Sequence, residues 1–360
     1  MNSNTYETDR LLWPEIMKIA ALFAVILIHS AAPLLVRYQK VGSTAWWIGN
    51  LYDSAARWCI PVFVMLSGTF LIDKADGSLL GRFLRRRVRR VLIPFLVWSG
   101  LYFLWRIYIN HEPLAFKNFF TLIFLEPVYY HLWFLYILIG LYLIAPIVNV
   151  YMQHASTRSV LYFLILWVLF GSLLPMVESF YHFSIYPTVR NAESLFAYFG
   201  YFVLGRALRD VVPTPMQRLL LIIAWFVAFG ATTVGTWYLT IVRNGGTFDA
   251  LFYDYYSINV IVMALSIFLA MKGKGIVTAD HVKPKGYQIT IAVAACVPGM
   301  YLIHAMIISM LLRGLAGFSF SKSSLPLALG VPVFAGVVFA ISLMIIIVIR
   351  KVPGVKWIVP

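Results

Sequence analysis

The stretch Glu15-Ile-Met-Lys18-Ile-Ala-Ala-Leu-Phe-Ala-Val-Ile-Leu-Ile-His29 is an apolar run that carries three ionisable side chains. In a helix that turns about 100° per residue, Lys18 and His29 lie about 20° apart, and Glu15 shares their face. About 16 Å of helix axis separates Lys18 from His29, roughly half the thickness of a bilayer core. Ionisable groups within a membrane span are costly and usually face the protein interior, so we interpret this face as a functional site. The alternative is that Lys18 extends to the cytoplasmic interface and that His29 is a hydrogen-bonded core residue.

The composition predicts the class of protein. Of the 360 residues, 61% are hydrophobic and only 12% are charged, a balance that excludes a soluble domain and predicts a polytopic membrane protein. The apolar runs are too long for β-barrel strands, so the predicted fold class is all-α with about ten transmembrane helices. The net charge of +15 is concentrated in short loops between apolar runs, which indicates membrane orientation rather than nucleic-acid binding. A lipid bilayer is the expected partner, and nucleic acid is not.

The predicted spans alternate with short polar loops, and Lys and Arg are concentrated at the termini and in every second loop. This alternation predicts that both termini are cytoplasmic. The chain is predicted to be a single domain over 1–360, with a cytoplasmic tail over about 1–16 and a basic cytoplasmic loop over about 73–90. The first run is expected to be a retained helix rather than a signal peptide, since Pro33 follows the candidate cleavage site. The ten predicted spans are 17–36, 46–72, 91–109, 131–150, 159–177, 193–208, 218–240, 252–271, 287–312 and 328–350.

Proline and glycine residues fall inside several of these spans. Such residues interrupt membrane helices where a protein lines a cavity, so we expect breaks there. The two cysteines also lie in apolar runs and imply no disulfide framework. The seven histidines show no metal-ligand spacing, so no metal is predicted. The expected interruptions are at Pro61, Gly68, Pro146, Gly200, Gly205, Pro298, Gly299 and Pro332.

The segment from Gly81 to Pro94 contains six arginines in nine residues, where the third span begins. The planar guanidinium of arginine suits phosphate groups, so one interpretation is a binding site for a phosphorylated cytoplasmic ligand. The other interpretation is a juxtamembrane basic segment held against anionic lipid. The segment by itself favours neither of them.

Two charged residues lie inside the second span. Asp53 and Arg57 are four residues apart, and we predict that they form an intramembrane ion pair. A structural role, in which the pair holds helices together, is the favoured interpretation.

Two further motifs combine histidine with an aromatic residue. His131 and Trp133 open the fourth span, either as part of an interfacial aromatic belt or as the rim of an acceptor pocket. Tyr301 and His304 follow a Pro-Gly pair in the ninth span, where His304 is either part of a site or a buried hydrogen-bond partner.

These features, in this order, resemble the acyltransferase 3 family of integral-membrane acyltransferases. The first helix of that family carries an acidic residue, then Arg or Lys, then ten residues and His, and Glu15, Lys18 and His29 fit this pattern. Lys18 replaces the commoner Arg and Glu15 the commoner Asp, which keeps both charges, although Lys does not form a bidentate pair. The later motifs that carry the resemblance are Pro61-Val-Phe-Val-Met-Leu-Ser67-Gly68, Arg87-Val-Arg-Arg90-Val-Leu-Ile-Pro94, His131-Leu-Trp-Phe-Leu and Tyr301-Leu-Ile-His304.

The resemblance covers nearly the whole chain. The short form, without a fused hydrolase-like domain, is similar to the enterobacterial common antigen O-acetyltransferase type. The resemblance implies a multi-pass protein of the bacterial inner membrane that modifies a polysaccharide of the cell envelope. The implied reaction moves an acetyl group from cytoplasmic acetyl-CoA to a hydroxyl of a surface polysaccharide or lipid-linked sugar.

The resemblance also implies a role for each motif. His29 is expected to be the general base, and Lys18 with Glu15 to orient the site or hold the donor. The residues expected to bind the phosphates of the donor are Arg86, Arg87, Arg89 and Arg90. The residues expected to bind the acceptor are His131, Trp133, Tyr301 and His304. The residues expected to support the site are Asp53, Arg57 and Ser67.

Two other classes of protein remain open from the residues alone. In a proton-coupled transporter or flippase-like carrier of a sugar or glycolipid, Glu15, Lys18 and His29 would form a proton relay. Consumption of acetyl-CoA distinguishes the acyltransferase from the carrier. In a scaffold of a glycan-assembly complex, Arg87 and Arg90 would be dispensable. The sequence makes no prediction of the oligomeric state.

Overall fold

The computed structural model describes residues 11–36, 41–72, 80–181, 190–272, 285–314 and 326–359. Within these ranges, nine helical segments are long and apolar enough to cross a membrane. The predicted all-α polytopic membrane protein is thereby confirmed. Most of the predicted cytoplasmic tail, residues 1–10, and the first part of the predicted basic loop, residues 73–79, lie outside the described residues.

The helices follow the predicted spans closely. A π-helical turn, Leu169–Leu173, joins α7 to α8, and another, Tyr238–Arg243, continues α10. The helices are α1 Leu12–Val36, α2 Thr44–Ala56, α3 Cys59–Leu71, α4 Leu80–Tyr108, α5 Asn118–Leu125, α6 Trp133–His154, α7 Thr157–Val168, α8 Leu174–Tyr181, α9 Arg190–Ala207, α10 Pro215–Trp237, α11 Ile258–Ala270, α12 Lys285–Leu312 and α13 Leu327–Lys351.

The predicted span over 193–208 corresponds to α9, an 18-residue helix that is not among the nine apolar segments. It is more polar than the others because it carries Arg190, Glu193 and Arg206. Its second half is nevertheless buried, since Tyr201 and Phe202 are fully enclosed by the bundle. Packing against α3, α6 and α7 therefore accounts for its place in the fold better than its own hydropathy does.

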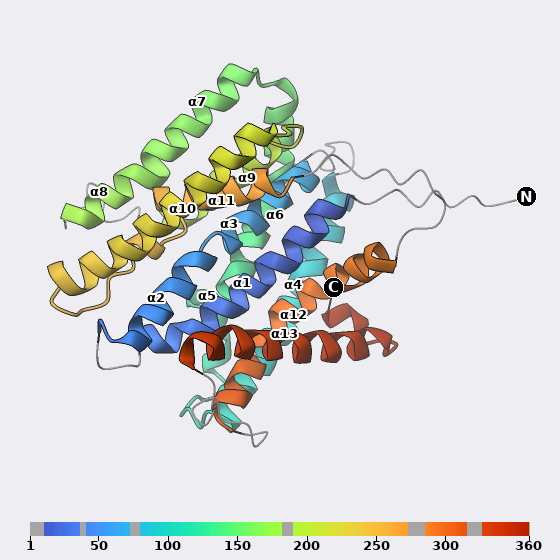
Figure 1. Cartoon of the computed structure of the whole chain (residues 1–360). Coiled ribbons are helices and arrows are strands. Elements are labelled where there is room, and N and C mark those ends of the chain that lie inside the picture. Colours follow the sequence, from blue (N-terminus) through green and yellow to red (C-terminus); the bar gives the residue numbers. More distant parts are fainter. Residues whose placement is uncertain are drawn as a thin grey trace, which may run out of the picture.

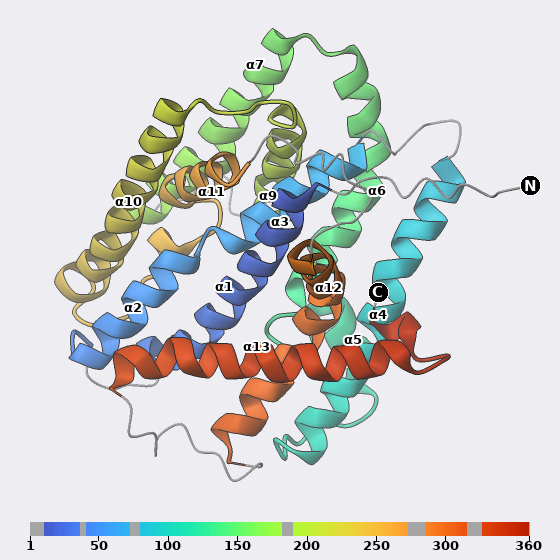
Figure 2. The ribbon, with the colours of Figure 1, turned by 45° about the vertical axis from the view of Figure 1, so that its right-hand side comes forward.

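The first helix, α1, runs through the middle of the bundle (Figure 1). It packs against α2 and α3 on one side and against α12 and α13 on the other. Figure 2 shows α13 lying across α1 and α12, and Figure 1 shows α7 and α8 at the edge of the molecule. The residues of α1 that face the bundle are therefore enclosed by four other helices.

Two glycines bring α3 and α9 into backbone contact. A Cβ atom on Gly68 would lie 1.9 Å from the carbonyl oxygen of Phe202, and one on Gly205 would lie 2.0 Å from the carbonyl oxygen of Met65. The hydroxyl of Thr69 donates to the carbonyl of Gly205 at 2.8 Å across the same contact. Small residues let membrane helices approach closely, so van der Waals contact and this hydrogen bond hold the pair together.

The expected helix breaks at proline and glycine are mostly wrong. α6, α12 and α13 continue through Pro146, Pro298 and Pro332, and Gly68 and Gly205 serve helix contacts. Neighbouring side chains can satisfy the backbone groups that a proline frees inside a membrane helix. In the described part of the second span, a break does occur at residues 57–58, one turn before Pro61.

A polar cluster ties together the ends of α9, α10 and α11. The ammonium of Lys272 donates to the carbonyls of Leu208 and Arg209, and Arg218 donates to the carbonyls of Ala270 and Lys272 at 2.8 and 2.5 Å. Lys272 is 3% exposed, and burial lowers the pKa of its ammonium to about 8. Both cations bind carbonyls at or just beyond helix C-termini, where the helix dipole favours positive charge.

Replacing Gly68 by Ala is expected to lower the melting temperature and the amount of folded protein in membranes. The added methyl group would overlap the backbone of Phe202, and α3 must move away from α9 at a cost of about 1–3 kcal/mol or more. The matched control is Gly230→Ala in α10, where a Cβ atom meets no neighbour within 4 Å. Equal melting temperatures for the two variants in detergent would contradict this account of the α3–α9 contact.

The buried Lys272 is expected to make stability depend on pH. Its ordinary pKa of 10.5 falls to about 8 on folding, so between these values the unfolded chain holds more protons. The contribution of this group to the free energy of unfolding therefore rises with pH across that window. The melting temperature of the wild type should rise between pH 8 and pH 10.5 relative to that of Lys272→Met. Lys351→Met, at an exposed position in α13, is the control and should keep the wild-type pH dependence.

Candidate functional site

The interruption between α2 and α3 begins the candidate site. Pro61 has no N–H group, and its ring clashes with the carbonyl of the residue four positions earlier, Arg57, so a continuous helix is disfavoured there. α2 ends at Ala56, α3 begins at Cys59, and Arg57 lies in the turn between them. The break therefore places a guanidinium group inside a membrane-spanning segment.

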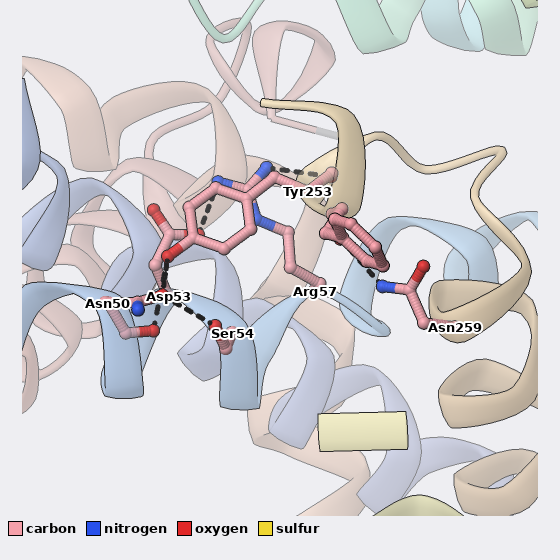
Figure 3. Close-up of polar contacts among 7 residues, drawn as sticks. Asn50, Asp53, Ser54, Arg57, Tyr253 and Asn259 are labelled. Atoms are coloured by element: carbon pink, nitrogen blue, oxygen red, sulfur yellow. Dashed lines mark hydrogen bonds and ion pairs between the residues drawn. The ribbon is translucent and has the colours of Figure 1, made fainter. Parts of the chain in front are cut away.

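Arg57 forms an ion pair with Asp53, and both side chains are largely buried. Its guanidinium lies 4.2 Å from the ring centre of Tyr253 and donates to the backbone carbonyl of the same tyrosine at 3.3 Å (Figure 3). Tyr253 belongs to the short 3-10 helix Leu251–Tyr253 that precedes α11. The ion pair therefore links the break in the second span to the segment in front of α11.

A hydrogen-bond network fixes this link in position. The hydroxyl of Tyr253 donates to the side-chain oxygen of Asn50 at 2.5 Å, and Ser54 donates to the same oxygen at 3.1 Å (Figure 3). The amide of Asn50 donates in turn to the carbonyl of Thr233 in α10 at 3.0 Å. Asn50 and Ser54 are both fully buried. Hydrogen-bonded polar groups of this kind are rigid, because any displacement leaves a buried group without a partner.

Three histidines from α1, the start of α6 and α12 converge in one cluster. The ring centres of His29 and His304 are 5.4 Å apart with nearly parallel planes, and those of His131 and His304 are 5.0 Å apart. His131 and His304 are fully buried, whereas His29 is partly exposed. Of the three imidazoles, His29 is therefore the one that a substrate reaches most directly.

Hydrogen bonds to the backbone determine the tautomer of two of these histidines in their neutral form. His304 Nδ1 is 2.6 Å from the carbonyl oxygen of Tyr301, and His131 Nε2 is 3.2 Å from that of Leu302. A carbonyl only accepts, so each of these ring nitrogens carries the proton. The opposite nitrogens, His304 Nε2 and His131 Nδ1, are buried acceptors without a partner among the described residues. Unpaired buried acceptors are costly, so a water molecule or a ligand that donates a hydrogen bond is expected beside each of them.

Tyr102 of α4 holds the histidine-bearing part of α12 in place. Its hydroxyl donates to the carbonyl of Leu302 at 2.8 Å and accepts from the N–H of Met306 at 3.1 Å. The ring centres of Tyr102 and His131 are 4.9 Å apart. The hydroxyl of Tyr301 also donates to the carbonyl of His131 at 2.5 Å. The positions of His131 and His304 thus depend on hydrogen bonds between α4, α6 and α12.

Aromatic rings surround the cluster. The ring centre of Tyr130 lies 4.8 Å from that of His29, and Trp133 lies 5.8 Å from Tyr255 in a nearly parallel arrangement. Tyr255 is 5.7 Å from the guanidinium of Arg57, and the charge of Arg57 also acts on His29. The ion pair at the helix break and the histidine cluster therefore belong to one continuous site.

The residues predicted for the cytoplasmic side are not part of this cluster. Lys18 pairs with Glu15 at 2.9 Å near the beginning of α1, with 34% and 12% of their side chains exposed. The pair lies three helical turns before His29, about 16 Å along the axis. Ser67 donates to the carbonyl of Phe63 within α3 and makes a helix-internal contact.

The predicted basic loop is helical from residue 80 onward, because α4 begins at Leu80 and continues into the third span. The side chains of Arg85, Arg89 and Arg90 are exposed. The side chains of Arg86 and Arg87 lie outside the described residues, so their predicted contacts with a ligand stay predictions.

Several aromatic residues of the site were missed by the sequence analysis. Tyr102, Tyr130, Tyr253 and Tyr255 lie in the site, but 21 tyrosines occur in the chain and no local pattern distinguishes these four. The described residues contain no group of three or more His, Cys, Asp or Glu side chains placed to hold a metal ion. The described side chains of the site offer hydrogen bonding, proton transfer by imidazole and the charge of one guanidinium.

The fold and the site together define a class: a polytopic α-helical membrane protein with a buried histidine cluster inside the bundle. The family model of an acyltransferase domain, acyltransferase 3, matches residues 11–350. The chain therefore belongs to the acyltransferase 3 family and is a membrane-bound acyltransferase. No curated protein and no solved structure matches the chain.

Replacing Tyr102 by Phe is expected to slow acyl transfer and to lower stability by about 1–2 kcal/mol. The variant loses the hydroxyl that bonds Leu302 and Met306, so the part of α12 that carries His304 is held less firmly. The matched control is Tyr136→Phe, which also removes a tyrosine bond to a carbonyl, that of Ile123 at 2.8 Å, but away from the histidines. Melting temperature and transfer rate are measured for both variants. A similar loss of transfer in the two would contradict a positioning role for Tyr102.

Proposed function

We propose that this acyltransferase is an O-acetyltransferase of the bacterial inner membrane. It takes an acetyl group from cytoplasmic acetyl-CoA and transfers it to a hydroxyl of a cell-envelope polysaccharide or lipid-linked sugar. The observation that carries the proposal is the convergence of His29, His131 and His304, with two buried ring nitrogens that find no hydrogen-bond donor in the part of the chain that the structure describes. A sugar hydroxyl supplies the donor that these nitrogens lack.

In the proposed reaction, His29 is the general base. Its partly exposed imidazole takes the proton of the acceptor hydroxyl while the hydroxyl oxygen attacks the thioester carbonyl carbon. The C–S bond of the donor then breaks, and the departing thiolate of coenzyme A receives the proton from His29. The acceptor oxygen and the acetyl group then form the ester product, and His29 returns to its neutral form. A covalent acyl-imidazole intermediate on His29 is the less favoured variant of this mechanism.

The acceptor sugar is proposed to lie against His131, Trp133, Tyr301 and His304. His131 Nδ1 and His304 Nε2 accept hydrogen bonds from sugar hydroxyls, which orients the ring without adding charge. The indole of Trp133 offers a flat apolar surface to one face of a sugar. The resemblance to enzymes that acetylate enterobacterial common antigen makes a glycan of that type our preferred acceptor.

The donor is proposed to enter from the side of Lys18 and the arginine-rich start of α4. Exposed Arg89 and Arg90, together with Arg86 and Arg87, are proposed to bind the phosphates of coenzyme A. The Glu15–Lys18 pair is proposed to orient this end of the donor, as a charged pair on the helix that carries the base. The thin pantetheine arm then spans the roughly 16 Å of α1 between Lys18 and His29.

Replacing His29 by Ala is expected to abolish acetyl transfer while leaving donor binding intact. A general base contributes typically about 100- to 10,000-fold to a rate, so transfer should fall by at least two orders of magnitude. Purified protein in detergent is incubated with radiolabelled acetyl-CoA and a bacterial envelope extract that contains lipid-linked sugars and polysaccharide. The matched control is His154→Ala, which replaces an exposed histidine at the C-terminal end of α6. This variant should transfer acetyl groups at the wild-type rate.

Arg87→Ala/Arg90→Ala extends the same assay to the donor site. This double variant should weaken binding of acetyl-CoA, whereas the rate at saturating donor changes less. A folded wild type that neither binds nor consumes acetyl-CoA would overturn the proposed function. Full transfer by a folded His29→Ala protein would overturn the assignment of the base.

A further inference from the structure

We propose that the guanidinium of Arg57, held at the break between α2 and α3, binds the thioester oxygen and stabilises the negative charge that develops on it. This inference rests on the proposed function, because it assigns one more group to the same transfer reaction. It changes the role of Arg57 from a support that joins helices to a residue that contacts the reacting atoms.

The hydrogen bonds of Arg57 leave part of its guanidinium free for a ligand. A guanidinium has five N–H donors. One terminal nitrogen pairs with Asp53, the other donates to the carbonyl of Tyr253, and the buried Nε has no partner among the described residues. An unsatisfied buried donor costs about 1–3 kcal/mol, so Nε is expected to meet a hydrogen-bond acceptor when the site is occupied. The free donor therefore indicates a ligand atom that accepts a hydrogen bond.

The location of Arg57 suits a reacting carbonyl. Tyr255 connects Arg57 to the histidine cluster, because its ring centre lies 5.7 Å from the guanidinium and 5.8 Å from the ring centre of Trp133, two residues after His131. No side chain caps the N-terminus of α3, and Pro61 in its first turn has no N–H to donate. The negative end of the α2 dipole and the positive end of the α3 dipole meet at this break, so the guanidinium itself is the source of positive charge there. Positive potential beside a base is what an oxygen that gains negative charge requires.

The surroundings of Arg57 keep it in one orientation before a substrate arrives. Its guanidinium packs on the ring of Tyr253, 4.2 Å from the ring centre, and the hydroxyl of that tyrosine is fixed by Asn50. The ring centre of Tyr255 also lies near this guanidinium, at 5.7 Å. Asp53 balances the charge, which lowers the cost of keeping a cation in a membrane span. A donor group fixed in advance needs no reorganisation during the reaction.

The proposed step balances as follows. The acceptor oxygen forms a bond to the carbonyl carbon, the C=O double bond becomes a single C–O⁻ bond, and the proton of the hydroxyl moves to His29. Arg57 donates hydrogen bonds to the C–O⁻ oxygen while the charge lasts. The double bond then reforms as the C–S bond breaks, and the proton on His29 leaves with the thiolate of coenzyme A. No oxidant, reductant or metal enters this step.

The test removes the cation without leaving an unpaired charge. In the double variant Asp53→Asn/Arg57→Gln, two neutral amides replace the ion pair. Transfer of labelled acetyl from acetyl-CoA to the envelope extract should fall about 100-fold in kcat, the size seen on loss of an oxyanion donor. The Kd for acetyl-CoA should stay close to the wild-type value, and the melting temperature should fall no further than in the control double variant. A kcat within a few-fold of the wild type in folded protein would overturn the proposal.

The matched control is a second Arg–carboxylate pair outside the site. Arg106 donates to Glu112 at 2.8 Å and to the carbonyl of Val128 at 3.1 Å, which imitates the contacts of Arg57 with Asp53 and Tyr253. The variant Arg106→Gln/Glu112→Gln should keep the wild-type kcat. An equal fall of kcat in both double variants would show a general loss of structure and would overturn a specific role for Arg57.

Chemical rescue provides an independent readout. In Arg57→Ala, added ethylguanidinium should occupy the vacated position beside Asp53 and restore part of kcat, whereas ethylammonium should restore less. Rescue of melting temperature without rescue of kcat would show a purely structural cation and would overturn the proposal. A folded wild type that transfers no acetyl group refutes the proposed function itself. If folded His29→Ala loses transfer but the folded Arg57 variants keep it, this inference alone is refuted.

Discussion

The ion pair of Asp53 and Arg57 is the interaction on which the rest of the site depends. A charge inside a membrane span persists only when a partner within the protein balances it, so the two residues must stay together. Arg57 lies in the turn between α2 and α3, so the pair holds its guanidinium at the end of α2. Through Tyr253 it also fixes the segment before α11, and with it the ring of Tyr255 that packs on Trp133. One interaction thus connects the second span to the aromatic wall of the histidine cluster.

Close helix contacts provide the frame around this pair. Gly68 and Gly205 let α3 and α9 touch backbone to backbone, and the resulting contact excludes even a methyl group. In a bilayer, apolar side chains gain little from leaving lipid, so such contacts and hydrogen bonds supply much of the association between helices. The hydroxyl of Tyr102 joins α4 to α12 by hydrogen bonds to the backbone of Leu302 and Met306, beside His131. The site is rigid because moving any of these buried polar groups would leave a donor or an acceptor without its partner.

In the proposed reaction, the groups for the donor and the base lie at different positions along α1. Its first turns carry the Glu15–Lys18 pair, and its last turns carry His29, about 16 Å away. A reaction between a donor and an acceptor that approach from opposite membrane faces requires this separation, because the reacting atoms must meet inside the protein. Tyr255 and Trp133 connect the helix break at Arg57 to the histidine cluster, where two imidazole nitrogens have no partner among the described residues. Base, charge-stabilising donor and acceptor contacts then surround one position.

The sequence by itself determined the membrane class, nine of the apolar spans and the ion pair of Asp53 with Arg57, because hydropathy, helix length and side-chain spacing within a turn are local properties. It also placed His29, His131 and His304 among the candidates, each on its own motif. Only the tertiary structure decided that these three imidazoles share one cluster and that Arg57 borders it, since they come from different helices. It also decided that Gly68 and Gly205 serve a helix contact rather than a break. The physical reason is that contacts between distant segments depend on how whole helices pack, which no local pattern records.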